Sequence, residues 1–229
     1  MSSEAPQVAG VLDAVRARPP RALGAGRAIM FVSARRGEGV TTVARAATLA
    51  AGPGNVYAID LDVRRNALVR AFSDSETPLG PRIVGRLGGQ LFYEMRLADG
   101  RPWLEYRPAF FFHRLGRLRA YVSAFDASEV PEGGRLLISD QAQYWDAARA
   151  GGATVIVDAP ALERSRIGLR VARHMDGVVL VVGADEGAAP AAVAAKSEIL
   201  AAGGQLIGLV CTHASPPVMA LERLWRHAG

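Results

Sequence analysis

The stretch that decides the fold is residues 29–42, Ile-Met-Phe-Val-Ser-Ala-Arg-Arg-Gly-Glu-Gly-Val-Thr-Thr. An apolar run ends at Ser33, a short loop carries two glycines, and two threonines open a predicted helix. Glycines let backbone N–H groups converge on an anion, and the amino end of a helix adds partial positive charge. The stretch therefore predicts a phosphate-binding loop. Its candidate ligand-binding residues are Arg35, Gly37, Glu38, Gly39, Thr41 and Thr42.

The loop lacks the lysine that such a loop normally carries directly before its first threonine. Val40 stands in that position. Valine has no charge with which to bridge two phosphate groups, and loss of one preorganised donor typically lowers a reaction rate roughly 10²–10³-fold. Arg35 lies in the same loop, and a guanidinium group can reach phosphate oxygens in bidentate fashion. We therefore expect turnover to suffer more than binding.

Three aspartates follow apolar runs that read as strands: Asp60, Asp62 and Asp158. Ligands of open α/β sheets bind outside the carboxyl ends of the strands, so these carboxylates are expected near the loop. Such groups hold Mg²⁺ and orient an attacking group. Asp60 and Asp62 are candidate catalytic residues, and Thr41, Asp62 and Asp158 are candidate metal ligands. A strand-end aspartate can instead cap a helix, and this alternative remains open for each of them.

From Arg27 onward, apolar strand-like runs alternate with helical stretches. This order is typical of parallel βαβ units, whose strands are buried on both faces. We predict an α/β fold with a doubly wound, mostly parallel sheet. The predicted strands are 28–33, 56–60, 154–158, 177–182 and 205–212, and the predicted helices are 8–16, 42–51, 141–150, 167–174, 190–202 and 218–227.

The middle of the chain departs from this order and holds most of the aromatic residues. The run 110–125, with a turn near Gly116, predicts a β-hairpin, because aromatic and alternating residues suit a half-buried pleated surface. We expect residues 1–26 to be an N-terminal helix and flexible arm, and 27–229 to be one domain with an aromatic-rich β-insert at about 75–135. The aromatic side chains either pack this insert onto the sheet or form a surface for a partner.

Composition narrows the class of protein. Of 229 residues, 50% are hydrophobic and 21% charged, which suits a globular chain. The single cysteine, Cys211, excludes an intramolecular disulfide framework and favours a reducing compartment. No apolar run reaches the about 18 residues that a membrane span needs. The net charge is +5, and all but one of the 27 basic residues are arginine. This bias reflects a GC-rich genome better than a nucleic-acid site, so we expect no nucleic-acid partner.

Taken together, the motifs resemble the cytoplasmic domain of bacterial tyrosine kinases that work in capsule and exopolysaccharide synthesis and export. That group is part of the wider MinD/ParA set of deviant Walker ATPases with a P-loop NTPase fold. The resemblance rests on Ser-x-x-x-Gly-Glu-Gly-x-Thr-Thr, Ile-Asp-x-Asp-x-Arg-Arg, Val-Ile-Val-Asp-x-Pro and His-Met-Asp-Gly-Val-Val-Leu-Val-Val, within residues 27–72 and 152–213. It implies that ATP and Mg²⁺ are the cofactors. It aligns Gly37, Gly39 and Thr41 with Walker A, Asp60 and Asp62 with the second Walker motif, Asp158 with Walker B, and Arg35 with the signature lysine of the MinD/ParA relatives.

The chain departs from these kinases at Val40, and residues 221–229 contain no tyrosine cluster. We therefore expect a degenerate kinase that acts as the regulatory partner of an inner-membrane polysaccharide co-polymerase. Its expected location is the cytoplasm, peripheral to the inner membrane through that partner, and homo-oligomerisation stays open. The alternatives are an active tyrosine kinase or a MinD/ParA-like ATPase in which Arg35 replaces the lysine.

Overall fold

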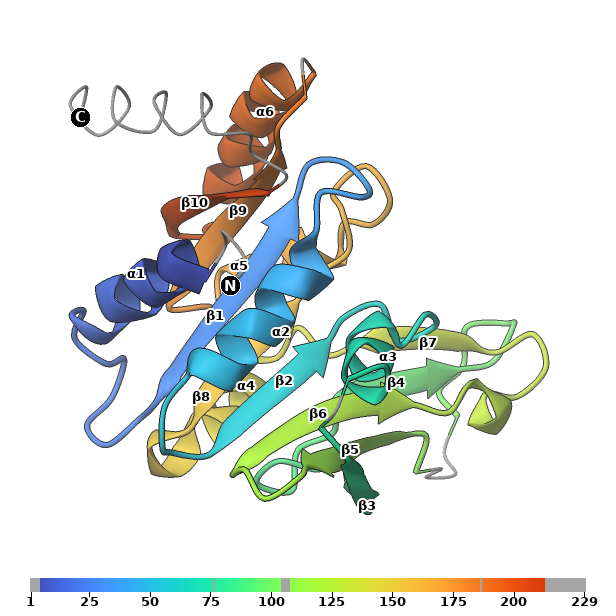
Figure 1. Ribbon diagram of the computed structural model, residues 1–229. Helices are drawn as coiled ribbons and strands as arrows, with labels where there is room; N and C mark the ends of the chain where they lie inside the picture. Colours follow the sequence, from blue (N-terminus) through green and yellow to red (C-terminus); the bar gives the residue numbers. More distant parts are fainter. Residues whose placement is uncertain (1–4, 76, 104–107, 186, 213–229) are drawn as a thin grey trace.

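The computed structural model describes residues 5–75, 77–103, 108–185 and 187–212, and its centre is one eight-stranded sheet (Figure 1). The strand order is β10-β9-β1-β8-β2-β6-β5-β3. Pairing is parallel from β10 to β6 and antiparallel between β6, β5 and β3. The strands are β1 (Arg27–Ser33), β2 (Val56–Asp60), β3 (Leu79–Val84), β5 (Phe110–Leu115), β6 (Ala120–Phe125), β8 (Thr154–Asp158), β9 (Gly177–Gly183) and β10 (Leu206–Thr212).

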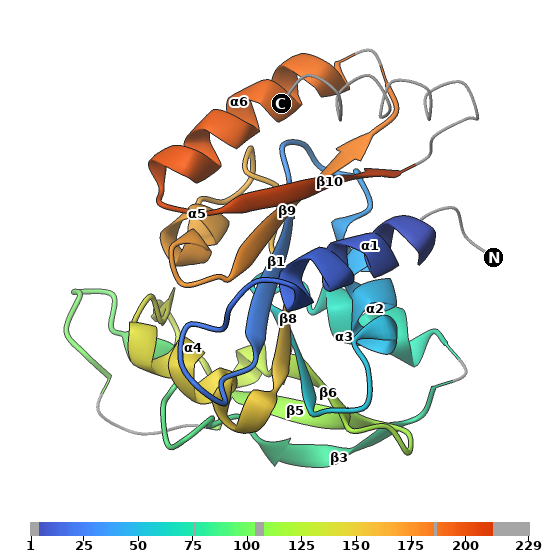
Figure 2. The same ribbon diagram turned by 90° about the vertical axis from the view of Figure 1, so that its left-hand side faces the viewer.

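The central strand β1 explains why helices cover both faces of the sheet. Successive side chains of a strand point to opposite faces, so Met30 and Val32 join one buried cluster while Ile29 and Phe31 join the other. The second cluster also holds apolar side chains of α1 (Ala5–Arg16), α2 (Val40–Ala50) and α3 (Ala67–Ser73). The first holds those of α4 (Ala142–Ala148), α5 (Ile167–Ala172) and α6 (Ala188–Ala201), and Figure 2 shows the two helical layers. The predicted doubly wound α/β fold is confirmed.

All strands predicted for the parallel core are present within about a residue of their expected bounds. The helices agree less closely with the prediction. The helix α3 is an addition to the predicted elements. The predicted helix 218–227 lies outside the described residues. Among the helices that the structure describes, none is long and apolar enough to cross a membrane.

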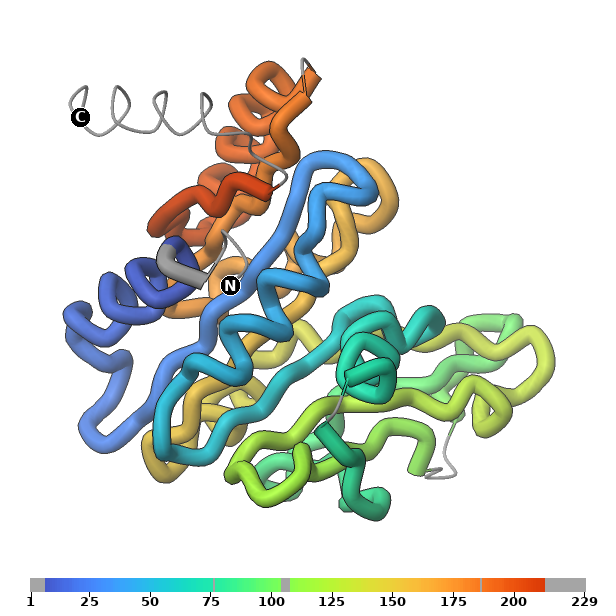
Figure 3. The backbone as a smooth tube through the Cα atoms, viewed as in Figure 1, coloured from blue at the N-terminus to red at the C-terminus, as the bar shows by residue number. Residues whose placement is uncertain are grey.

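The aromatic insert extends the main sheet. The predicted hairpin at 110–125 is β5 and β6, joined by a turn in which Gly116 has a φ of 50°. β6 pairs with β2, so the insert continues the sheet beyond β2, as the green part of the tube in Figure 3 shows. Two further strands, β4 (Tyr93–Arg96) and β7 (Arg135–Ile138), form a separate antiparallel pair.

The aromatic side chains of the insert are largely buried. The ring of Phe92 stacks on Phe110 with 4.2 Å between centroids and contacts Tyr144 and Trp145 of α4. Aromatic pairs of this kind stabilise by about 0.5–1.5 kcal/mol beyond the area they bury. Packing of the insert onto the sheet is therefore the role that these contacts support.

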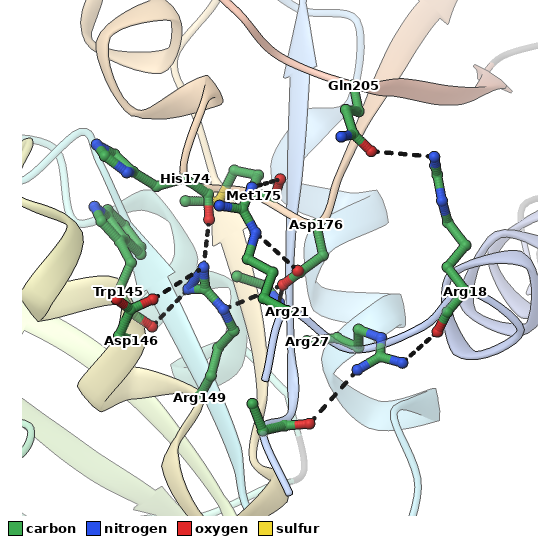
Figure 4. A network of polar contacts seen from close by, with 12 residues as sticks. Arg18, Arg21, Arg27, Trp145, Asp146, Arg149, His174, Met175, Asp176 and Gln205 are labelled. Atoms are coloured by element: carbon green, nitrogen blue, oxygen red, sulfur yellow. Dashed lines mark hydrogen bonds and ion pairs between the residues drawn. The ribbon is translucent and has the colours of Figure 1, made fainter. Parts of the chain in front are cut away.

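The amino ends of the parallel strands are held by a buried ion pair (Figure 4). Asp176 lies directly before β9 and accepts hydrogen bonds from the backbone of Ala28 at 2.7 Å and the guanidinium of Arg21 at 3.1 Å. Arg149 follows α4, and its Nε lies 3.3 Å from the same carboxylate. Its other nitrogens donate to the carbonyls of Trp145 and His174. This network ties the segment before β1 to α4 and β9.

Candidate phosphate-binding site

The predicted loop lies between β1 and α2, at the carboxyl end of the parallel strands. Gly37 and Gly39 adopt left-handed φ values of 79° and 84°, which side chains with a Cβ rarely adopt. A Cβ on Gly39 would also lie 3.2 Å from the Thr212 side chain. The loop leads straight into Val40, the first residue of α2, so its backbone lies at the amino end of an eleven-residue helix.

A pocket of about 270 Å³ lies over this loop, and we call it the phosphate pocket. Most of the predicted site residues meet there, because β2 and β8 are neighbours and Asp60 and Asp158 occupy the same register. Arg35 and Thr42 are not among the residues that line it. The predicted residues that do are Gly37, Glu38, Gly39, Thr41, Asp60, Asp62 and Asp158.

Arg35 is engaged elsewhere. Its guanidinium donates to both oxygens of Asp185, at 2.7 and 2.8 Å, and to Glu38 at 3.2 Å. The hydrogen bond with Asp185 is the main reason that the pKa of Arg35 is raised. These contacts direct the side chain toward the loop after β9, away from the walls of the phosphate pocket.

Glu38 has a structural position within the loop. Only 4% of the residue is exposed, and its carboxylate accepts from the backbone N–H groups of Arg35 at 2.9 Å and Gly183 at 3.2 Å. Its carbonyl oxygen accepts from the Thr212 hydroxyl at 2.8 Å. Glu38 thus joins the loop to the ends of β9 and β10 and fixes its shape.

The two buried carboxylates differ in their hydrogen bonds. Asp60 accepts from the backbone N–H of Asp62 at 2.7 Å and of Leu68 at 3.1 Å, so it caps the start of α3 as well as facing the pocket. Burial raises its pKa to about 6. Burial, and next the charge of Asp60, raise the pKa of Asp158 well above its usual value. Oδ2 of Asp158 is buried without a hydrogen-bond partner. This oxygen is therefore able to accept a hydrogen bond or to coordinate a cation.

Asp62 is paired with an arginine that the sequence analysis missed. Arg164, from the loop after β8, lines the phosphate pocket and donates to both Asp62 oxygens, with Nη2 3.0 Å from Oδ1. This hydrogen bond is the main cause of the raised pKa of Arg164. Arg65 lies 3.9 Å from the same carboxylate. Only the high arginine content of residues 64–65 and 164–166 could have signalled these cations.

The loop after β8 also touches the phosphate-binding loop directly. The backbone N–H of Leu162 donates to Ser33 at 2.9 Å, and that of Glu163 donates to Ala34 at 3.2 Å. In return, the Glu163 carboxylate accepts from the backbone N–H of Arg36 at 2.8 Å. Two N–H groups of the loop, those of Arg35 and Arg36, are therefore bonded to carboxylates of the chain itself.

The donor set fits Mg²⁺ with a phosphorylated ligand. Magnesium prefers oxygen ligands and is commonly held by one or two carboxylates together with substrate phosphates. Thr41, Asp62 and Asp158 supply such oxygens, and the partnerless Oδ2 of Asp158 supports the fit. No group of three or more acidic, histidine or cysteine side chains in the described ranges is arranged to hold a metal by itself. Phosphate oxygens would have to complete the shell.

Comparison with known proteins identifies the fold. No protein-family model and no curated protein sequence matches this chain. Among solved structures, the kinase domain of VpsO is 15% identical with a TM-score of 0.56, covering 92% of this chain and 96% of that one. The kinase domain of the Escherichia coli tyrosine kinase ETK is 17% identical with a TM-score of 0.52, covering 83% and 70%. An ATP complex of McdA from Cyanothece is 14% identical with a TM-score of 0.54, covering 90% and 80%. The chain therefore has the P-loop NTPase fold that these two kinase domains and McdA share.

Proposed function

We propose that this protein binds ATP with Mg²⁺ in the phosphate pocket and uses the bound state for regulation, with little or no phosphoryl transfer. One observation carries the proposal. The loop and the strand-end aspartates line one pocket, while Val40 occupies the position of the lysine. The McdA structure of the same fold is an ATP complex, which supports ATP as the ligand.

Each residue has a distinct part in this proposal. The backbone from Gly37 to Thr41 surrounds the phosphates, and Thr41, Asp62 and Asp158 hold Mg²⁺, which would neutralise phosphate charge. Asp62 has to leave Arg164 in order to bind a metal, and this releases a guanidinium group beside the phosphates. Arg164 and Arg36 line the pocket, whereas Arg35 does not, so they are better placed than Arg35 to contact phosphate.

The same residues explain why we expect little or no phosphoryl transfer. Valine at position 40 offers no positive charge to the transferring group, and the guanidinium of Arg164, once released by Asp62, does not reproduce a compact ammonium ion. Asp60, the candidate base, is bonded to two backbone N–H groups, which ties it to the start of α3. We therefore expect the protein to bind ATP but to transfer its phosphoryl group slowly or not at all.

The proposed setting is polysaccharide export. By resemblance to the bacterial tyrosine kinases, we propose that the chain docks on an inner-membrane polysaccharide co-polymerase from the cytoplasm and regulates chain length or export. Neighbouring genes for glycosyltransferases and an outer-membrane export protein would support this setting. Genes of an unrelated pathway would count against it.

The test combines titration calorimetry of ATP and Mg²⁺ with an assay for transfer of labelled phosphate. The proposal expects Mg²⁺-dependent binding and no labelling of this chain or of an added tyrosine-rich protein. Clear phosphorylation would overturn the regulatory assignment in favour of an active kinase. Absence of binding would overturn the assignment of the pocket.

A further inference from the structure

A second and larger cavity adjoins the phosphate pocket. Its volume is about 440 Å³, and it shares Asp62, Pro160 and Arg164 with that pocket. One wall is β7, from the two-stranded sheet that is not hydrogen-bonded to the main sheet but lies beside it (Figure 1). The other walls are the loop after β2 and the segment that runs from the loop after β8 into α5. Of its lining residues, the proposed ATP site uses Asp62 and Arg164.

The lining combines apolar side chains with arginine. Its arginines are Arg64, Arg164, Arg166 and Arg170, and Asp62, already bonded to Arg164, is the acid in the lining. Arg166 pairs with Glu198, and Arg170 pairs with Asp140 at 2.9 Å, both outside the lining. Within the described ranges, no hydrogen bond or ion pair engages Arg64, which is exposed. The apolar walls come from Leu61, Val63, Leu136, Leu137, Ile138 and Ile167.

We propose that this cavity binds a small organic anion, namely a phosphate or carboxylate group carried on an apolar body. Guanidinium groups recognise phosphate and carboxylate in bidentate geometry, and the exposed ion pairs of Arg166 and Arg170 contribute little stability that a ligand would have to replace. The apolar walls favour a ligand with a hydrophobic body over a bare inorganic ion. The volume lies in the range of about 300–1,000 Å³ typical of small-molecule sites. This ligand is distinct from the proposed ATP, so the inference goes beyond the proposed function.

The shared wall gives the second site a defined relation to the first. Arg164 lines both cavities and reaches Asp62, which also lines both. An anionic group at the inner end of the second cavity would lie beside the guanidinium group that faces the phosphate pocket. The organic anion would then bind adjacent to the phosphates of the proposed nucleotide.

The first test uses 1-naphthyl phosphate as the probe, titrated calorimetrically into the full chain without nucleotide. The controls are 1-naphthol, which lacks the charge, and inorganic phosphate, which lacks the apolar body. The proposal expects naphthyl phosphate to bind at least about tenfold more tightly than either control. Equal affinity for inorganic phosphate, or for naphthol, would overturn it. Because ATP is absent, this result is independent of the proposed nucleotide binding.

The second test locates the probe. Arg64→Gln removes a guanidinium group that makes no contact needed for folding, and it should weaken naphthyl phosphate about tenfold. Arg117→Gln, an exposed arginine in the β5–β6 turn, is the matched control and should leave the affinity unchanged. Both variants should unfold at the same denaturant concentration as the parent chain. If Arg64→Gln binds the probe as tightly as the parent, the probe lies elsewhere and the assignment of this cavity is wrong.

Discussion

Carboxylates are buried at both ends of the parallel sheet, but they differ in whether the chain supplies all their hydrogen-bond partners. At the amino end, Asp176 accepts from a backbone N–H and from Arg21, and it forms an ion pair with the almost wholly buried Arg149 (Figure 4). At the carboxyl end, Asp158 is buried with one oxygen that has no partner, and its pKa is raised. A carboxylate with all its partners supplied by the chain serves the fold. A carboxylate with an oxygen that lacks a partner is available for a ligand. This difference separates a structural end of the sheet from a binding end.

The largest expected effect is at the structural end. Asp176→Ala should lower the free energy of unfolding by about 3–5 kcal/mol, because it removes the buried carboxylate partner of Arg149 and leaves that guanidinium with the exposed Asp146 at 3.5 Å. Denaturant unfolding measures this change. Asp13→Asn, which removes an exposed pair with Arg16, is the control and should stay within about 0.5 kcal/mol of the parent. A loss at Asp176 as small as at Asp13 would remove the proposed contrast between the two ends.

The next effect concerns Asp60 and the pH dependence of stability. Its pKa is raised to about 6, so ionisation costs the folded protein about 3 kcal/mol relative to an ordinary carboxyl group. Below pH about 4, both states hold the proton and the contribution is zero. As pH rises toward 6, the unfolded state releases the proton first, so this contribution to stability falls, and above pH 6 it is constant.

Carbon NMR of the aspartate carboxyl groups measures this pKa directly. One carboxyl resonance should titrate near pH 6 and be missing from Asp60→Asn. The fall in stability between pH 4 and 6 should also be smaller in that variant. An Asp60 that titrates near its ordinary pKa would mean that the binding end is open to water.

Asp158→Asn should act on stability in the direction opposite to Asp176→Ala. Ionisation of the buried parent carboxyl is unfavourable, because burial raises its pKa, and a neutral amide avoids this cost, so the variant should be more stable at pH 7 by about 1–3 kcal/mol. The gain should shrink as pH falls toward the ordinary pKa of the carboxyl group, because the unfolded parent then also becomes protonated and the difference between the two states disappears. Thermal and denaturant unfolding at both pH values measure the difference. Destabilisation at pH 7 would place Asp158 with Asp176 as a structural residue.

The smallest expected effect comes from restoring the missing charge. Val40→Lys should raise the affinity for ATP about tenfold, which corresponds to about 1.4 kcal/mol. Val40→Met is the matched control, because it is long but uncharged, and should not raise the affinity. Titration calorimetry distinguishes the two variants. An equal gain in both would assign the effect to packing at the start of α2.

The binding end was easier to predict from the sequence than its cations. Asp60 and Asp158 end apolar runs, and neighbouring parallel strands bring such ends together, so local pattern and the rules of sheet topology suffice. Arg164 reaches Asp62 only because the loop after β8 folds back onto the end of β1, and Arg35 pairs with Asp185 150 positions away. Contacts of this kind depend on loop conformation, which no short-range pattern encodes.

The fold shows the same difference between elements that a local sequence pattern marks and elements that depend on tertiary packing. The buried parallel strands were predicted because continuous apolar runs mark them. The strand β3 was missed, because it is mostly exposed and contains Gly80 and Pro81, which disfavour strands. The pair β4 and β7 has only four residues in each strand. These weakly patterned strands depend on packing against the aromatic cluster, and one of them forms a wall of the second cavity.

Titration of ATP and Mg²⁺ into the parent chain and into Asp158→Asn tests the central claim most directly, with unfolding measured in parallel. We predict Mg²⁺-dependent binding to the parent and at least about tenfold weaker binding to the variant, although the variant is the more stable protein. Equal affinity in the two chains, or no binding to the parent, would contradict the assignment of the carboxyl end of the sheet as a nucleotide site.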